Sequence, residues 1–431
     1  MRSGSRTDVP LSRWFASRQG VLHADDASLE AIAADVGTPC YVYAARAIDE
    51  AFASVSASLA WGPHLIAYAV KANGNRSILA RLARVGAGAD VVSIGELARA
   101  MGAGIPPERI VWSGVAKTDD DIAAALDAPI RAIHVESAPE LERVESIARA
   151  RGVVAAISLR VNPDVDASTH PYIATGLHDT KFGLELDVAR KLVPKIAASK
   201  ALRLEGVSCH IGSQIDTPAP LADAVEIVAR FALECASQGL APTSLDAGGG
   251  WPIAYGDEEA PYPSWKAYGE AIREGIERAG ARELCREVIV EPGRAIVGDA
   301  GVLLTRVVYV KEQAGKRFVL VDAGMTELIR PALYSAYHAV VPVLAPALGA
   351  RLAPADVVGP VCETADFFAL GRSLPPLVRD DVLAIRGAGA YGASMGSNYN
   401  ARPLAPEVLV DRAEWRVVRR RQPLEDLWRL E

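Results

Sequence analysis

A single lysine, Lys71, stands directly after a short apolar run and before an Asn-Gly turn signal. The run, Leu65–Val70, has the small and β-branched residues of a strand that is buried on both faces. At the end of such a strand, a lysine has an apolar stem and an ammonium head directed into a cleft. Desolvated lysines are suited to Schiff-base chemistry with an aldehyde cofactor. A lysine that reaches from a strand end to water gives the same local pattern.

Two later segments place further reactive groups directly after apolar strand-like runs. In the first, His210 can lie flat against an aromatic ligand ring, and Ser213 can bond a phosphate oxygen. A structural histidine with satisfied hydrogen bonds is the alternative. In the second, the glycines let backbone N–H groups approach an anion closely. These glycines are Gly248, Gly249 and Gly250.

The segment Glu291-Pro292-Gly293-Arg294 ends the last strand of this region. A carboxylate in a pocket of low dielectric can hold a pyridine nitrogen protonated, which makes the ring an electron sink. Arg294 can bind a phosphate or a substrate carboxylate through two parallel hydrogen bonds. A Glu–Arg ion pair at a domain junction is the alternative.

The C-terminal third of the chain holds three more candidate segments. Arg330 and Tyr334 share one face if their segment is helical, which gives a carboxylate clamp. Cys362 beside Glu363 combines a proton donor with a group that binds amines, although a buried inert cysteine gives the same pattern. Tyr391 places a phenol in a glycine-rich turn, where its hydroxyl could reach a phosphate.

The candidate residues from Lys71 to Arg294 lie in a region where strand-like runs alternate regularly with helix-compatible segments. Eight such runs predict an α/β fold of the (β/α)8 TIM-barrel type, and a doubly wound open sheet is the alternative. The polar residues that follow successive strands favour the barrel, which builds its sites at that end. The predicted strands are Leu65–Val70, Ala89–Val92, Ile110–Trp112, Ala132–Val135, Val154–Val161, Gly206–Cys209, Ser244–Ala247 and Val288–Val290.

After Glu291 the pattern changes to short strands separated by Gly and Pro, which predicts a β-rich second domain of sandwich or Greek-key type. The residues before Gly20 read as loosely structured, and the strand Cys40–Tyr43 can pair with the second domain. We expect the barrel over residues 46–294 and the second domain from residues 1–45 and 295–431. Its predicted strands are Gly301–Val310, Arg317–Val321, Val357–Val361, Asp381–Ala384 and Glu407–Leu409.

Composition narrows the classes of function. The formal net charge of −7 disfavours a nucleic-acid partner or an anionic membrane. The five cysteines are scattered without a CxxC pair, so neither a disulfide framework nor a metal site is indicated. We see no signal peptide and no apolar run long enough to span a bilayer, and we expect a cytoplasmic enzyme.

Taken together, these motifs resemble the fold-type III pyridoxal-phosphate decarboxylases of alanine-racemase-like fold, and among them the family that acts on diaminopimelate. The resemblance runs from about Gly37 to Asp411. Two departures are CETAD, where the family usually has Cys-Glu-Ser-Gly-Asp, and Gly396-Ser397, where it usually has Ser-Ser. The matching stretches are AYAVKANGN around Lys71, GAGADVVSIGEL around Asp90, HVES at His134, RVNP at Arg160, HPYIATGLHDTKFGL from His170, CHIGSQI, DAGGGWPI, EPGR, DAGMTELIRPALYSAYH, VCETAD and GAYGASMGSNYNARP.

The resemblance implies a role for each candidate. Lys71 carries pyridoxal 5′-phosphate as a Schiff base, His210 stacks on its ring and Cys362 protonates the substrate carbon. The family homodimer shares its active sites, because Cys362 and Glu363 come from the neighbouring subunit. The implied cofactor-binding residues are Lys71, Asp90, Arg160, His210, Ser213, Gly248, Gly249, Gly250, Glu291, Pro292, Gly293, Arg294 and Tyr391, and the implied substrate-binding residues are Arg294, Arg330, Tyr334, Glu363 and Tyr391.

The implied reaction is the decarboxylation of meso-diaminopimelate to L-lysine. A decarboxylase of another basic amino acid is the first alternative, but its substrate lacks the distal carboxylate that Arg294, Arg330 and Tyr334 would bind. Alanine racemase shares the barrel but does not need the Cys362-Glu363 pair. A non-catalytic homologue that binds the cofactor or a protein partner is the third alternative, and the retained Lys71 and Glu291 disfavour it.

Overall fold

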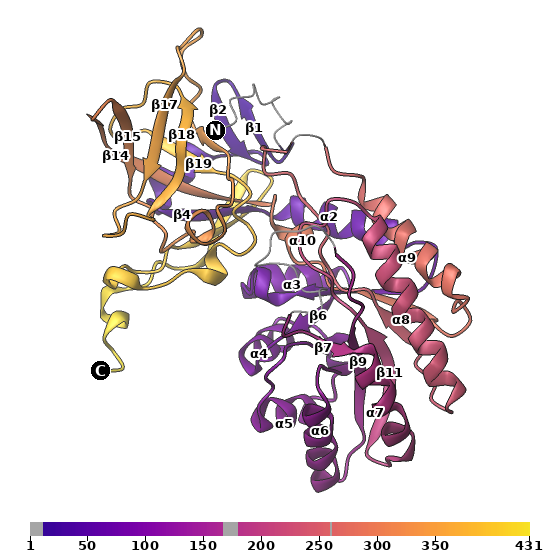
Figure 1. Cartoon of the computed structure of the whole chain (residues 1–431). Coiled ribbons are helices and arrows are strands. Elements are labelled where there is room, and N and C mark those ends of the chain that lie inside the picture. Colours follow the sequence, from indigo (N-terminus) through magenta and orange to yellow (C-terminus); the bar gives the residue numbers. More distant parts are fainter. Residues whose placement is uncertain (1–11, 167–179, 259–260) are drawn as a thin grey trace. The chain divides into compact units, whose positions relative to one another are not determined.

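The computed structural model describes residues 12–166, 180–258 and 261–431, which form two compact units (Figure 1). The barrel unit comprises the described residues of Ala51–Pro252 and Tyr262–Ala295. The β-rich unit comprises those of Met1–Glu50, Ile253–Pro261 and Ile296–Glu431. The short segment Ile253–Pro261 therefore belongs with the β-rich unit, although the chain on either side of it is barrel. Most of the motif that begins at His170 lies outside the described residues.

The barrel unit contains all eight predicted strands, with ends shifted by a few residues. Each strand is parallel to its neighbours, and β13 pairs with β5 through Val288 and His64, which closes the sheet and excludes the open arrangement. The short β10 (Leu184–Glu185) extends the sheet beside β9. The barrel strands are β5 (His64–Ala69), β6 (Gly88–Val91), β7 (Ile110–Trp112), β8 (Ala132–Val135), β9 (Ala155–Asn162), β11 (Leu202–Ser208), β12 (Ser244–Asp246) and β13 (Glu287–Val290).

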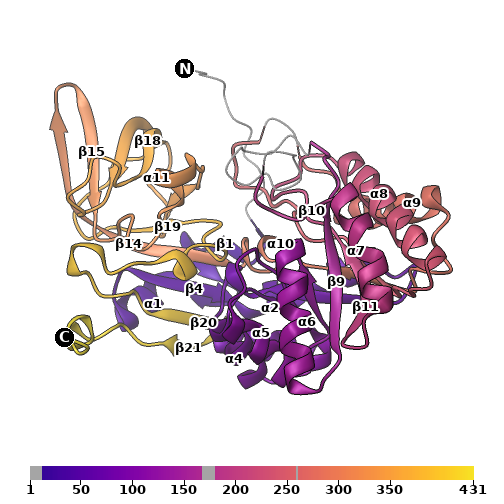
Figure 2. The same ribbon diagram turned by 60° about the horizontal axis from the view of Figure 1, so that its bottom comes forward.

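Helices cover the outside of the barrel strands, and α7 packs against β9 and β11 (Figure 2). Polar residues that follow the strands start several of these helices: the Ser93 hydroxyl accepts the N–H of Glu96, and Ser137 accepts that of Glu140. Such caps satisfy donors that the first turn leaves open. The helices are α2 (Ala45–Ser58), α3 (Arg76–Arg84), α4 (Ile94–Gly102), α5 (Asp119–Asp127), α6 (Ala138–Arg151), α7 (Leu186–Ala198), α8 (Ala219–Ser237) and α9 (Trp265–Ala279), with the short η1 (Val70–Ala72) and η2 (Pro107–Arg109).

The β-rich unit is built on a sheet in the order β18-β17-β15-β14-β4-β20-β21. The predicted pairing of the early strand is confirmed, because β4 joins β14 and β20. The strands are β4 (Cys40–Ala44), β14 (Gly301–Gln313), β15 (Lys316–Val321), β16 (Val340–Pro342), β17 (Ala353–Val358), β18 (Phe367–Leu374), β19 (Val382–Ile385), β20 (Glu407–Asp411) and β21 (Glu414–Arg419), and the helical segments are α1 (Leu29–Val36), α11 (Arg330–Tyr334), η3 (Ala393–Met395), η4 (Tyr399–Ala401) and η5 (Leu424–Leu427). The short α10 (Arg294–Val297) begins in the barrel unit and ends in the β-rich unit.

The expectation of a loosely structured N-terminus is wrong for its described part. Residues Phe15–Arg18 form β1, which pairs with β2 (Val21–Ala24), and β2 pairs in turn with β3 (Ala27–Ser28). Phe15 is completely buried, whereas the rest of β1 is largely exposed, so its sequence lacks the apolar alternation of a strand. None of the helices in the described part of the chain combines the length and apolarity needed to cross a membrane.

Candidate active site

Lys71 lies in η1, immediately after β5, and its ammonium group pairs with a carboxylate on the next strand. The Lys71 Nζ is 2.9 Å from Asp90 Oδ2. Asp90 is completely buried, whereas the Lys71 side chain is 39% exposed. Burial disfavours the ionised carboxyl, yet the charge and hydrogen bond of Lys71 keep the pKa of Asp90 below its usual value. The amine therefore meets a buried anion at the strand end and still reaches solvent.

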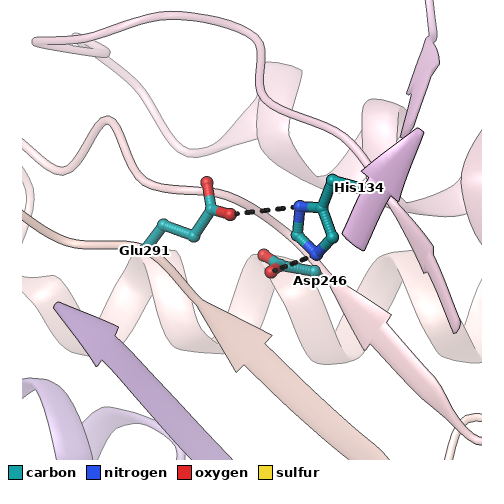
Figure 3. Close-up of side chains that lie close together, drawn as sticks. All are labelled: His134, Asp246 and Glu291. Atoms are coloured by element: carbon teal, nitrogen blue, oxygen red, sulfur yellow. Dashed lines mark ion pairs between the residues drawn. The ribbon is translucent and has the colours of Figure 1, made fainter. Parts of the chain in front are cut away.

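A second buried cluster joins residues of β8 and β12 with one that follows β13, although β8 is not a neighbour of the other two strands in the sheet (Figure 3). His134 of β8 has its Nδ1 3.5 Å from Glu291 Oε1 and its Nε2 3.7 Å from Asp246 Oδ2. The Ser113 hydroxyl lies between the first pair, 3.2 Å from both His134 Nδ1 and Glu291 Oε1. Because the carboxylates face opposite nitrogens of one ring, the arrangement is a chain of polar groups.

Burial dominates the electrostatics of this cluster. It raises the pKa of Glu291 well above its usual value, and the nearby charges of Asp246 and Asp90 add to the effect. Burial likewise raises the pKa of Asp246 to about 7. It lowers the pKa of His134 to about 3, so this imidazole is neutral. The barrel therefore holds a carboxyl group in a form that can share a proton with a bound base.

The glycine run after β12 packs tightly against the other strand ends. A Cβ on Gly249 would lie 2.3 Å from the carbonyl oxygen of Glu291, so only glycine fits. Its N–H, which the sequence suggested would face an anion, donates to His210 Nδ1 at 3.0 Å. That nitrogen is therefore the acceptor of the hydrogen bond. Burial, together with the positive charges of Arg160 and Lys71, lowers the pKa of His210 to about 3. His210 is a neutral ring beside the glycine run.

Two arginines of the barrel unit are held at the same end. Arg294 is buried, and its guanidinium donates to Ser213 Oγ from Nη2 at 3.0 Å, which brings together two of the predicted phosphate-binding residues. Arg160, at the end of β9, donates to Glu136 at 2.9 Å. Glu136 also accepts the N–H of Gly114 at 2.8 Å. The orientation of Arg160 is therefore fixed by a buried ion pair.

In the β-rich unit, Arg330 begins α11 as its Pro331 predicted, and the guanidinium is buried. Its Nη1 donates to the Tyr255 hydroxyl at 3.0 Å and to His338 Nε2 at 2.9 Å. Tyr334 lies at the other end of the same short helix and is half-buried. Tyr255 and His338, which are not among the predicted site residues, thus contact the guanidinium of Arg330.

Cys362 and Glu363 lie in a turn after β17, and both are exposed in the single chain. The Cys362 N–H donates to Asn400 Oδ1 at 3.0 Å, and the Tyr399 hydroxyl donates to the Glu363 carboxylate. The buried carboxylate of Asp366 in the CETAD motif accepts the N–H groups of Met325 and Val361, each at 2.6 Å. These contacts hold the turn so that the thiol and the carboxylate project from it.

Tyr391 occupies the glycine-rich turn after β19 with a φ of 55°. A bulky residue in this left-handed region is uncommon, and such positions cluster at functional sites. Its ring is half-buried. The backbone therefore holds this phenol in a fixed position at a local energetic cost.

Sequence reasoning left several of these groups without a role. In the sequence, His134 and Asp246 stand only as members of longer motifs, although a titratable side chain inside an apolar strand is a signal for both. Tyr255, His338 and Tyr399 carried no local signal, because their partners are distant in the chain. Lys117 was also missed, and its buried Nζ bonds the carbonyls of Gly114 and His134 and the carboxylate of Glu140.

Comparisons with known proteins agree with the resemblance. Residues 45–298 match the family model of the pyridoxal-dependent decarboxylases, specifically their pyridoxal-binding domain. Diaminopimelate decarboxylase from Zymomonas mobilis is 44% identical over 418 residues, which are 96% of this chain and 97% of the relative. The enzyme of the same name from Pseudomonas aeruginosa is 46% identical over 414 residues, again 96% and 97% of the two chains.

Solved structures extend the likeness to the fold. Diaminopimelate decarboxylase from Helicobacter pylori, crystallised with L-lysine, matches with a TM-score of 0.88 and 42% identity, over 93% of this chain and 98% of that one. The M. jannaschii enzyme, also in complex with L-lysine, matches with a TM-score of 0.91 and 34% identity, over 96% of each chain. This chain therefore belongs to the pyridoxal-dependent decarboxylases, within the diaminopimelate decarboxylase family.

Proposed function

We propose that this protein decarboxylates meso-diaminopimelate to L-lysine and carbon dioxide. The observation that carries the proposal is the Lys71–Asp90 pair at the strand ends of a closed barrel, with the buried Glu291 in the same electrostatic cluster. Similarity to relatives that bear the name diaminopimelate decarboxylase, and to structures with L-lysine bound, supports the choice of substrate.

The residues of the barrel fit pyridoxal 5′-phosphate. Lys71 supplies the amine for its aldehyde, and the buried Glu291 carboxyl, whose pKa is raised, supplies a partner for a pyridine nitrogen. The glycines of the run after β12 lack the Cβ that would clash with neighbouring atoms, so a ligand can approach the backbone closely beside His210. The Ser213–Arg294 pair offers a hydroxyl and a cation for a phosphate. When bound, this cofactor supplies an electron sink for the pair released by decarboxylation.

The remaining groups of the chain handle the substrate. Arg330, Arg294 and Tyr334 are assigned to its distal carboxylate, which a planar guanidinium can bind through two bonds. Glu363 receives the distal ammonium. Cys362 delivers a proton to the carbon that has lost carbon dioxide, as general-acid catalysis requires. This division matches a substrate whose distal end carries one charge of each sign.

Incubation of the holoenzyme with meso-diaminopimelate, with carbon dioxide and lysine both quantified, tests the reaction. Lysine and ornithine are the control substrates, because they lack the distal carboxylate. Borohydride reduction followed by peptide mapping should place the cofactor on Lys71, and Lys71→Ala should abolish the adduct. A turnover of ornithine equal to that of diaminopimelate, or an adduct on another lysine, would contradict the assignment.

Arg330→Ala tests the substrate clamp. We expect the KM for diaminopimelate to rise by about tenfold or more, since a hydrogen bond to a charged group contributes about 1.5–3 kcal/mol. The affinity for the cofactor should change little. Equal losses of cofactor and substrate affinity would show that Arg330 is structural.

We further propose a homodimer whose active sites are shared, with Cys362 and Glu363 acting in the partner's barrel. Support comes from the family resemblance and from the exposure of both side chains in the single chain. Inactive Lys71→Ala and Cys362→Ala chains should then complement when they are mixed and reassembled. Up to about a quarter of normal activity should return, because half the dimers are mixed and each has one intact site of two.

Hybrid dimers that form without any return of activity would show that each site is built within one chain.

A cytoplasmic location is proposed as well, since all five cysteines are free thiols.

A further inference from the structure

The buried contacts of Arg330 fix the protonation state of a histidine that the reaction does not use directly. His338 is completely buried, and its Nδ1 is 2.7 Å from the carbonyl oxygen of Arg386. A carbonyl only accepts hydrogen bonds, so Nδ1 carries the proton. On the other side, Nε2 is 2.9 Å from Arg330 Nη1, and a guanidinium only donates. Nε2 must therefore present its lone pair, which makes His338 neutral with a single tautomer.

We propose that neutral His338 is a positioning residue for recognition of the substrate's distal carboxylate, acting by holding the guanidinium of Arg330. The inference rests on the proposed function, in which Arg330 binds that carboxylate. His338 itself need not touch the substrate. Its lone pair fixes the direction of one Arg330 nitrogen, and the Tyr255 hydroxyl fixes the same nitrogen from a second direction at 3.0 Å.

The surroundings of His338 oppose a second proton. Arg330 of α11 faces its Nε2, and the edge-on ring of Tyr255 lies 5.2 Å away between centroids. Arg372 of β18 donates to the His338 carbonyl oxygen at 3.0 Å and stacks on Tyr337, with its guanidinium carbon 3.9 Å from the ring centre. Protonated His338 would thus be a cation among arginines.

Arg386, which follows β19, is the third arginine of this neighbourhood. Its side chain is buried, and burial lowers its pKa, while Asp299 lies 4.0 Å from it. Asp299 is the carboxylate that offsets this charge. Protonation of His338 at Nε2 would remove the lone pair that accepts the hydrogen bond from Arg330, and it would place the two cations, His338 and Arg330, in contact. A second proton on His338 should therefore weaken substrate binding.

Two substitutions separate the two sides of the imidazole. In His338→Gln, the amide oxygen can take the place of Nε2 and accept from Arg330, whereas in His338→Asn the amide nitrogen replaces only the donor to Arg386. We expect His338→Asn to raise the KM for diaminopimelate about tenfold, as for a lost bond to a charged donor. Its kcat and cofactor affinity should stay near those of the wild type. His338→Gln should remain within about threefold of the wild-type KM.

The pH profile supplies the second readout. The wild-type KM should rise at acidic pH relative to that of His338→Gln, because glutamine cannot be protonated there. Equal KM values for the two proteins at every pH would overturn the proposal, and so would equal losses in His338→Asn and His338→Gln. If neither histidine variant folds, Tyr255→Phe supplies the test. Without the Tyr255 hydroxyl, Arg330 depends more on His338, so the rise in KM at acidic pH should become steeper. An unchanged pH profile of KM would overturn the proposal.

Arg330→Ala separates this inference from the function on which it rests. If Arg330→Ala leaves the KM for diaminopimelate unchanged, the proposed role of Arg330 fails and the positioning role fails with it. If Arg330→Ala raises the KM but His338→Asn does not, the proposed function stands and only the role of His338 is overturned.

Discussion

Replacing Asp246 with asparagine should stabilise the cofactor-free protein at alkaline pH. Asp246 ends β12 with its side chain buried, and its Oδ1 accepts the N–H of Gly248 at 2.8 Å. Asparagine keeps a carbonyl oxygen for this bond and nearly the same shape. It removes a charge that burial and the neighbouring Asp90 both disfavour. The wild-type carboxylate therefore lowers stability wherever it is ionised.

The magnitude follows from the change in pKa on folding. Burial raises the pKa of Asp246 from 3.8 to about 7, so the folded state holds the proton more tightly than the unfolded state does. This contribution to stability is complete below pH 3.8 and is lost as the pH rises to about 7. A difference of this size corresponds to about 4 kcal/mol at pH 8 and to less than half of that at pH 5. The advantage of the variant should thus grow by about 3 kcal/mol between these two pH values.

Urea denaturation of the cofactor-free proteins at pH 5 and pH 8, followed by tryptophan fluorescence, measures the effect. Trp112 and Trp251 report on the barrel unit, because both are buried there. Asp187→Asn is the matched control, since that side chain is 81% exposed and the same substitution should show no comparable pH dependence. A constant difference between Asp246→Asn and the wild type at both pH values would refute the reasoning, because it would mean that folding leaves the titration of Asp246 unchanged.

Three further predictions concern groups that sequence reasoning did not assign. Tyr399→Phe should raise the KM for diaminopimelate by about three- to tenfold, because it removes the hydrogen bond that holds the Glu363 carboxylate. The same substitution should have no added effect in a Glu363→Gln background, and an additive effect would refute this coupling. Asn400→Ala should change the rate at which iodoacetamide alkylates Cys362, the one exposed cysteine, and an unchanged rate would show that Asn400 does not hold the turn. Lys117→Met should lower the free energy of unfolding by about 3–5 kcal/mol in a urea titration, because it leaves a buried carboxylate without its cation, and a loss below about 1 kcal/mol would contradict this.

The barrel could be predicted strand by strand because each of its strands is buried and bounded by turn residues. The β-rich unit was predicted less completely, and the strands missed there include β18 and β21, the two edges of its sheet. An edge strand carries charged or exposed side chains that prevent further pairing, which removes the alternation that marks a strand. β21 is largely exposed and rich in arginine, and β18 is interrupted by Gly371 in the left-handed region.

The candidate site divides in the same way. Lys71, Glu291 and the glycine run can be predicted as candidates, because each is a distinctive residue type directly after an apolar strand. His338 could not be found in this way, since its importance lies in contacts with Arg330 and Arg386, and the second of these is 48 residues away. Tyr255 is still harder to predict from the sequence, because it lies in the nine-residue segment Ile253–Pro261, which interrupts the barrel sequence and belongs to the β-rich unit. Tertiary contacts, and no local pattern, give such residues their roles.

The distribution of buried charge explains why net charge says little about this protein. The barrel unit buries a group of carboxyls at its strand ends, which suits a ligand whose ring carries positive charge. The β-rich unit buries the guanidinium groups of Arg330 and Arg386, which suits a carboxylate. The barrel unit also buries the cations of Arg160 and Arg294, and the β-rich unit also buries carboxyls such as that of Asp366, so buried charges of both signs offset one another within each unit. The total of −7 averages over both arrangements and over a well-solvated surface. In the proposed function, the distal end of the substrate is recognised by the buried Arg330 and the exposed Glu363, two single groups on which the net charge carries no information.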